Sequence, residues 1–109
     1  MSLKQSRGNQ LSGYLSRKGV VLADFCTAGS PPCEAQKQVV DLLSGQYVGK
    51  VTFETVDVDE CRHLAKSHRI TSIPTLIFFN NGQEIKRFVG LQKVELLSDA
   101  IENALALKI

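Results

Sequence analysis

The sequence VVLADFCTAGSPPC, residues 20–33, decides the fold, because it reads as a buried strand, a loop and the start of a helix. Residues 20–25 are apolar except for Asp24 and show no alternation of polar and apolar side chains, which is typical of a strand covered on both faces. Ser30 is a favoured helix N-cap, and Pro31 fits the first helical position. This segment therefore predicts a strand-to-helix unit of an α/β protein.

The chain downstream predicts more strands and a hairpin. Residues 51–58 read as a second buried strand, and Asp59 is predicted to cap a short helix after it. The residues Asn-Asn-Gly, 80–82, lie between two strand-like runs, 75–79 and 83–89. Asn-Gly in that setting is the strongest short-range signal for a β-hairpin, so the last two strands are expected to pair in antiparallel fashion.

Three longer helices are predicted from apolar residues at helical spacing. Asn9 would cap the first, which would end at Lys18, while the second follows Ser30 and the third is C-terminal. The residues expected to be buried in the three helices are Leu11, Tyr14 and Leu15; Ala35, Val39, Leu42 and Leu43; and Leu97, Ala100, Ile101, Ala104 and Leu105. The order β-α-β-α-β-β-α after the first helix predicts an α/β fold with one mixed sheet and helices on both faces, and we expect a single domain over residues 1–109.

The composition narrows the function. Thirteen basic and eleven acidic residues give a formal charge of only +2, without long charged runs, so nothing favours nucleic acid or membrane surfaces as partners. No apolar run approaches the roughly 18 residues of a membrane helix, and no secretory signal is evident. Three cysteines are too few for a disulfide scaffold, and we expect a cytoplasmic protein.

Metal and cofactor sites find little support in the sequence. Cys61 falls on the apolar face of its predicted helix, whereas His63 points elsewhere and His68 suits the helix end. No phosphate-binding loop, dinucleotide fingerprint or Ser-His-Asp arrangement is visible. We therefore predict no metal and no cofactor.

A family resemblance rests on several motifs in the same order along the chain. Val21-Leu22-Ala23-Asp24-Phe25, followed by eight residues ending in Pro32-Cys33, resembles the thioredoxin strand and active-site loop, whose usual form is V-D-F-W-A-x-W-C-G-P-C. Further matching landmarks are Val56-Asp57-Val58-Asp59, Ile73-Pro74-Thr75, Phe79-Asn80-Asn81-Gly82 and Gly90. Such ordered agreement over roughly residues 20–106 is far more specific than one motif.

The resemblance implies a fold, an activity and partners. The fold would be the thioredoxin fold, and the activity would be thiol–disulfide exchange without a cofactor. The partners would be protein substrates that present disulfides or extended peptide segments. The resemblance also allows a thioredoxin reductase as the electron donor.

The motif departs from the family at three positions. Cys26 replaces the first motif tryptophan, Gly29 replaces the second, and Ser30 replaces the nucleophilic cysteine. Thr55 also stands where the family commonly has a lysine, and Gln38 replaces a helix proline. A serine hydroxyl cannot form a disulfide, so ordinary Cys-x-x-Cys turnover is excluded for this chain.

Ser30 permits several interpretations. The simplest is a helix N-cap without chemical function, and the serine is either natural or engineered from cysteine. The leading hypothesis is a thioredoxin-like exchange protein that this serine impairs. The alternative is a non-catalytic binding module of the same fold. It would hold a partner in the groove beside Pro74, which matches the family's cis-proline.

Three further residues are candidates for chemistry. Cys33 lies at the family's resolving position, and it is either a reactive thiol or a small buried hydrophobic residue. Cys26 is a filler of the core or an auxiliary thiol that pairs with Cys33 across the loop. Burial should raise the pKa of Asp24, and the resemblance implies that this acid moves the proton of Cys33.

The substrate-binding residues follow from the resemblance. Pro74 matches the family's cis-proline, although it could simply form a turn before a strand. Ile73 would present its backbone to an extended peptide, and Pro31, Pro32 and Gly90 would complete the groove.

Overall fold

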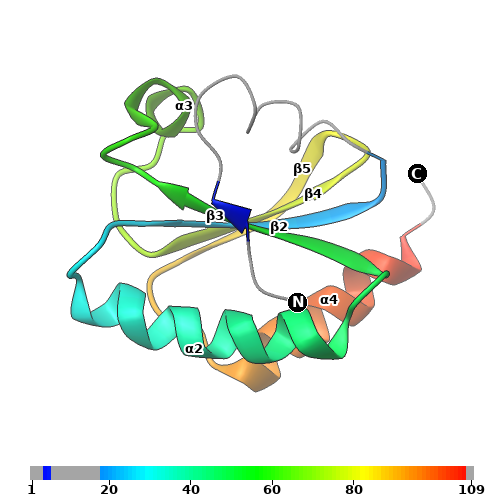
Figure 1. Cartoon of the computed structure of the whole chain (residues 1–109). Coiled ribbons are helices and arrows are strands. Elements are labelled where there is room, and N and C mark those ends of the chain that lie inside the picture. Colours follow the sequence, from blue (N-terminus) through cyan, green and yellow to red (C-terminus); the bar gives the residue numbers. More distant parts are fainter. Residues whose placement is uncertain (1–3, 6–17, 108–109) are drawn as a thin grey trace.

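The computed structural model describes residues 4–5 and 18–107, in which five strands form one mixed sheet (Figure 1). The strands are β1 (Lys4–Gln5), β2 (Val20–Cys26), β3 (Val51–Asp57), β4 (Thr75–Asn80) and β5 (Gln83–Val89). The helices are α2 (Pro31–Gln46), α3 (Arg62–Ser67) and α4 (Val94–Ala106). The helix predicted to begin at Asn9 lies, up to residue 17, outside the described residues.

The sheet has the strand order β1-β3-β2-β4-β5. β2 pairs in parallel with β3 and antiparallel with β4, while β4 and β5 form the predicted hairpin. Asn81 and Gly82 make its turn at φ values of 52° and 83°, a conformation that Asn and Gly tolerate best. Because β2 is central, both of its faces are covered, which explains its lack of alternation.

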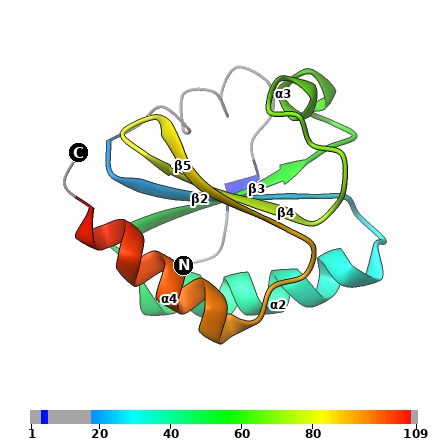
Figure 2. The same ribbon diagram turned by 180° about the vertical axis from the view of Figure 1, so that it is seen from behind.

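Helices lie on both faces of the sheet, with α2 and α4 on one face and α3 on the other (Figures 1 and 2). Val20 and Leu22 of β2 belong to the core cluster beneath α2 and α4. Val21 and Phe25 belong to the cluster beneath α3. The predicted α/β architecture is confirmed.

Helix α2 begins as predicted, with Ser30 as its N-cap, but it buries a different set of residues. Its buried residues are Cys33, Gln36, Val40, Leu43 and Ser44. The prediction that Ala35 and Leu42 would be buried is wrong, because both are exposed. The buried face includes the polar Gln36, and a search for apolar spacing cannot detect such a residue.

Two predictions about the other helices are also wrong. Asp59 does not cap α3; its backbone N–H instead donates to the side chain of Asp57 at 2.8 Å. The side chain of Asp59 accepts a hydrogen bond from the Thr27 hydroxyl, so it ties the motif loop to the turn after β3. In α4, Leu105 is exposed, because the helix directs Leu97, Ile101 and Ala104 towards the sheet.

Candidate active site

The candidate active site forms where β2 ends and α2 begins. Side chains alternate along β2, so Asp24 and Cys26 lie on the same face as Leu22, towards α2. In the sheet Asp24 is paired with Thr55 of β3 and Leu76 of β4. Thr55 therefore flanks the buried acid at the place where the resemblance led us to expect a lysine.

Asp24 is a buried acid in an apolar setting. Only 2% of its surface is exposed. The pKa of Asp24 is raised from 3.8 to about 6, and burial is the largest cause. The hydrogen bond from Cys26 acts to lower this pKa, and the charge of Asp41 acts to raise it. The pKa shift has the direction expected for an acid in an apolar strand, and it brings the carboxyl group close to neutral pH, where it can exchange protons.

Cys26 lies between this acid and the first turn of α2. Its thiol donates a hydrogen bond to Oδ1 of Asp24 at 3.2 Å. Burial, the charge of Asp24 and a hydrogen bond with the neighbouring Cys33 all raise the pKa of the Cys26 thiol well above its ordinary range. At neutral pH the Cys26 thiol is therefore protonated.

Cys33 is the motif thiol of α2, and Ser30 lies one turn before it. The thiol points inwards, and only 4% of the residue is exposed. Oγ of Ser30 accepts a long, 3.5 Å hydrogen bond from the backbone N–H of Cys33, which is the N-cap interaction expected from the sequence. At position 30 the site thus holds a hydroxyl that stabilises the helix, where exchange would need a thiolate.

The proline loop meets the site from the neighbouring strand. Phe25 pairs with Thr75 antiparallel, so the segment before β4 lies at the same end of the sheet as Cys26. The Ile73–Pro74 peptide bond is cis, and the carbonyl of Pro74 accepts a hydrogen bond from the N–H of Gly90 at 2.8 Å. The structure therefore brings together two of the predicted substrate-binding segments.

The remaining predicted binding residues lie at the surface. Pro31 and Pro32 are exposed on the first turn of α2, and Ile73 is half-buried. Gly90 has a φ of 93°, with open space where a side chain would project. Pro31, Pro32 and Ile73 therefore offer accessible surface next to the motif.

Gln36 is a site residue that sequence reasoning missed. It is fully buried, and its amide makes two hydrogen bonds with the backbone of Gln92, from Nε2 to the carbonyl at 3.1 Å and from the N–H to Oε1 at 2.7 Å. Gln36 therefore fastens the loop after Gly90 to α2. Its position one turn after Cys33 on the buried face was the only available signal.

The residues considered for a metal differ in burial and in the residues they contact. Cys61 is buried, His63 is exposed, and the ring of His68 lies 5.9 Å from Phe25 and 5.5 Å from Phe79. Within residues 4–5 and 18–107, no group of three or more His, Cys, Asp or Glu side chains is arranged to hold a metal ion. None of the helices in this part of the chain has the length and apolarity needed to cross a membrane.

Comparisons with known proteins agree on one family. Residues 4–103 match the thioredoxin family model. The thioredoxin of Staphylococcus saprophyticus is 38% identical over 89 residues, which are 82% of this chain and 86% of that protein. A thioredoxin of Staphylococcus epidermidis is 37% identical over 87 residues, which are 80% and 84% of the two chains.

Solved structures of thioredoxins are also similar to this chain. A mutant thioredoxin from Halobacterium salinarum NRC-1 superposes with a TM-score of 0.89 at 32% identity, covering 99% of this chain and 95% of that one. Thioredoxin from Plasmodium falciparum gives a TM-score of 0.85 at 26% identity, with coverages of 93% and 98%.

Family and fold support thiol–disulfide exchange as the general chemistry, and thioredoxins generally act on the disulfides of protein substrates. The family model spans nearly the whole chain, and both curated relatives exceed one-third identity over most of their length. This chain therefore belongs to the thioredoxin family.

Proposed function

We propose that this chain is a thioredoxin-type exchange protein in which Ser30 blocks the first step of protein disulfide reduction. The observation that carries the proposal is the buried acid Asp24, held beside the motif thiols at the end of β2. Burial of a carboxyl group lowers the stability of the fold, so its presence favours a functional role. Proton transfer to and from thiols is a role that suits its pKa of about 6. Apart from the missing nucleophile, this arrangement supports an exchange site.

The block follows from the chemistry of the two motif positions. Exchange begins when a thiolate attacks a substrate disulfide, and a second thiol then resolves the mixed disulfide. Ser30 occupies the partly exposed position at the N-terminus of α2, where the helix dipole would favour a thiolate, but its hydroxyl cannot attack. Cys33 has the right chemistry, but it is buried behind the loop. As it stands, the chain should reduce protein disulfides poorly.

The proline loop is the proposed docking edge for the substrate. Ile73 precedes the first paired residue of β4, so its backbone can pair with an extended peptide. Val89 and Leu91 flank Gly90 and are both exposed, which adds an apolar rim. We propose that substrates bind here as extended segments, that a thioredoxin reductase is the electron donor, and that the protein works in a reducing compartment such as the cytoplasm.

The proposal is tested by restoring the missing sulfur. Ser30→Cys should confer dithiothreitol-dependent reduction of insulin at a rate at least about tenfold above the unchanged chain, because it places a thiol at the helix N-terminus with Cys33 one turn away. Ser30→Ala is the matched control, since it changes the same atom without adding sulfur. Rapid turnover by the unchanged chain or by Ser30→Ala would show that Ser30 does not block exchange.

A second candidate function is supported by the capping role of Ser30. Its hydroxyl has a structural use, and the docking edge around Ile73 needs no thiol at position 30. If Ser30→Cys folds and forms a disulfide with Cys33 but still shows no insulin reduction, the chain is better described as a binding module that holds a peptide at this edge.

A further inference from the structure

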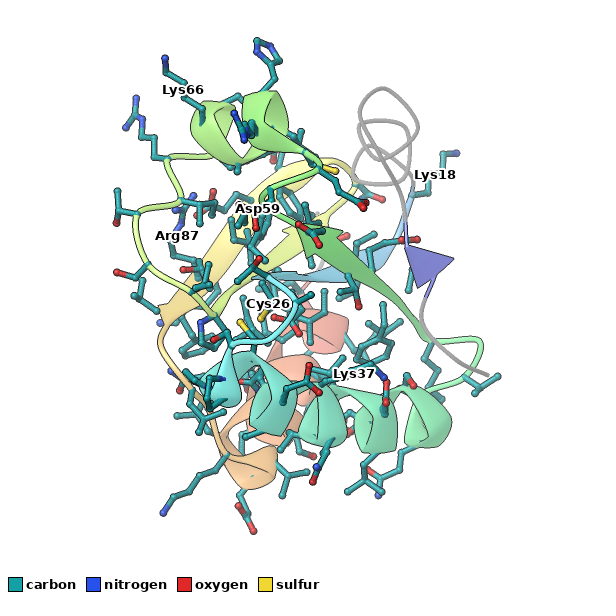
Figure 3. All side chains as sticks on the ribbon, turned by 60° about the vertical axis from the view of Figure 1, so that its left-hand side comes forward. Lys18, Cys26, Lys37, Asp59, Lys66 and Arg87 are labelled. Carbon is teal, nitrogen blue, oxygen red and sulfur yellow. The ribbon has the colours of Figure 1, made fainter. Side chains whose placement is uncertain are left out.

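The motif loop has a second thiol on its inner side that the proposed function does not use. Cys26 is the last residue of β2, and Cys33 lies in the first turn of α2. The alternation of β2 directs the side chain of Cys26 towards α2, and Cys33 is on the buried face of that helix. The loop of residues 27–30 therefore folds back so that both thiols enter the same space, and Figure 3 shows Cys26 at the junction of the loop and α2.

The two thiols and one acid form a small buried group, which we call the inner cluster: Asp24, Cys26 and Cys33. The Cys26 thiol donates to Asp24 at 3.2 Å and interacts directly with the side chain of Cys33. Cys26 is only 7% exposed and Cys33 only 4%. The cluster is closed to bulk water, and its two sulfurs are neighbours.

The third cysteine of the chain is kept apart from this group. Cys61 is buried in the core cluster beneath α3, with Val21 and Phe25, on the opposite face of the sheet. The sheet itself therefore lies between Cys61 and the inner cluster. Any disulfide formed within one chain is restricted to Cys26 and Cys33, and Cys61 serves as an internal control.

We infer that Cys26 and Cys33 form a reversible intramolecular disulfide, so that the chain has a two-electron redox pair on the inner side of the motif even though position 30 holds serine. The inference deepens the proposed function, because it names the pair that stores the reducing electrons. It can also be tested without measuring the reduction of a protein substrate, because the disulfide is observed in the chain itself.

The oxidant is a low-molecular-weight disulfide such as glutathione disulfide. When the loop of residues 27–30 opens and exposes Cys33, the Cys33 sulfur attacks the glutathione disulfide. This forms a Cys33–glutathione bond, breaks the glutathione disulfide and releases one glutathione that takes the Cys33 proton. The Cys26 sulfur then attacks the Cys33 sulfur and releases the second glutathione. Two cysteine thiols lose two electrons and two protons, and one disulfide becomes two thiols.

Asp24 is placed to accept the proton of the second step. Its Oδ1 already accepts the hydrogen bond of the Cys26 thiol, so the proton needs to move only along that bond before it passes to the departing glutathione. Without a base, the Cys26 thiol would have to lose its proton inside an apolar space. We therefore assign Asp24 as the base for closure of the disulfide.

The test counts thiols in the full-length chain. After equilibration with excess glutathione disulfide, the protein is quenched in acid, denatured and alkylated, and its peptides are identified by mass spectrometry. The three cysteine thiols should fall to one, on Cys61, with a Cys26–Cys33 linked peptide and no retained glutathione. Dithiothreitol should return all three thiols.

Variants separate the two steps. Cys26→Ser should leave a stable glutathione adduct on Cys33, with Cys26→Ala as a second variant in case the serine perturbs folding. Asp24→Asn should form the adduct and then close at least about tenfold more slowly, because the base is missing. Cys61→Ser should form the same Cys26–Cys33 disulfide as the unchanged chain.

Several outcomes would overturn the inference. These are retention of all three thiols, a lasting glutathione adduct on Cys33 while Cys26 is present, or a disulfide that involves Cys61. Each of these results is independent of insulin reduction by Ser30→Cys. Failure of the inner disulfide and failure of the proposed function can therefore be told apart.

Discussion

The two sides of the first turn of α2 differ in almost every physical property. The outer side, residues 30–32, is exposed or half-exposed and offers a hydroxyl and two proline rings. The inner cluster of Asp24, Cys26 and Cys33 is buried and holds two sulfurs and an acid. The outer side is the accessible one, so in this chain the thiols and the accessible atoms are on opposite sides of the same turn. The same turn thus keeps a buried acid beside two thiols while its accessible position holds a hydroxyl.

Asp24→Asn should have the largest effect on stability, because it removes the charge from the inner cluster. Since the folded-state pKa of about 6 exceeds the ordinary 3.8, the folded chain binds the proton more tightly than the unfolded one. The free energy of unfolding should therefore fall as the pH rises from about 4 to about 6, by about 3 kcal/mol in total. Above that window Asp24→Asn should be more stable than the unchanged chain by a similar amount.

Urea unfolding at pH 4 and pH 8 measures this difference. Gln38→Ala, which changes an exposed neutral side chain of α2, serves as the control and should leave the pH dependence unchanged. Equal stability of Asp24→Asn and the unchanged chain at pH 8 would mean that the ionised carboxylate of Asp24 does not lower the stability of the folded chain. The contrast between a destabilising buried inner cluster and the exposed outer side would then fail.

Gln36→Ala should have the next largest effect, because Gln36 joins the buried face of α2 to the loop after Gly90. Removal of its amide leaves the N–H and carbonyl of Gln92 without these partners, which should lower the free energy of unfolding by about 2 kcal/mol. Gln38→Ala, an exposed change two residues away in the same helix, should lie within about 0.5 kcal/mol of the unchanged chain. Thermal or urea unfolding measures the stability of both variants. Similar values would refute the role of Gln36 in fastening the loop after Gly90 to α2.

Ser30→Ala should have the smallest effect of the three on stability. Loss of an N-cap typically costs about 1 kcal/mol, and the long 3.5 Å bond to Cys33 places this one at or below that value. Ser30→Asp, which can accept the same hydrogen bond and adds a charge favoured by the helix dipole, should restore the stability. The midpoints of urea unfolding compare the stability of the variants. A loss of stability in Ser30→Ala that Ser30→Asp does not restore would mean that the hydroxyl has a role other than capping.

The main strands, the start of α2 and the hairpin could be predicted from the sequence, because signals within a few residues determine them. The uninterrupted apolar run of β2, the N-cap and proline at the start of α2, and the Asn-Gly turn each act over a few residues. Asp24 was recognisable for the same reason, since a charge within an apolar run is visible without knowledge of the fold.

The remaining features depend on contacts between distant residues. The only local signal that Gln36 is buried is its position one turn after Cys33, because its hydrogen-bonding partner Gln92 lies 56 residues away. Asp59 looks like a helix cap, but Asp57 makes the turn and Thr27 takes up the Asp59 side chain. The spacing of Cys26 and Cys33 allowed both a pair and two separate thiols, and only the return of the loop over the end of β2 makes them neighbours.

The contact between Gly19 and Asn81 affects how the thiols can be reached. The N–H of Gly19 donates to Oδ1 of Asn81 at 2.9 Å, and the N–H of Asn81 donates to the carbonyl of Gly19 at 3.1 Å. These bonds fasten the hairpin turn to the beginning of β2, at the end of the sheet away from the motif. At the motif end, the hydrogen bond from the Thr27 hydroxyl to Asp59 holds the loop of residues 27–30 to the turn after β3. Exposure of the inner cluster should therefore require that bond to open while the far end stays closed. Access to the buried sulfurs then becomes a small, repeatable excursion of one loop, and its frequency sets an upper limit on the rate of any exchange they undergo.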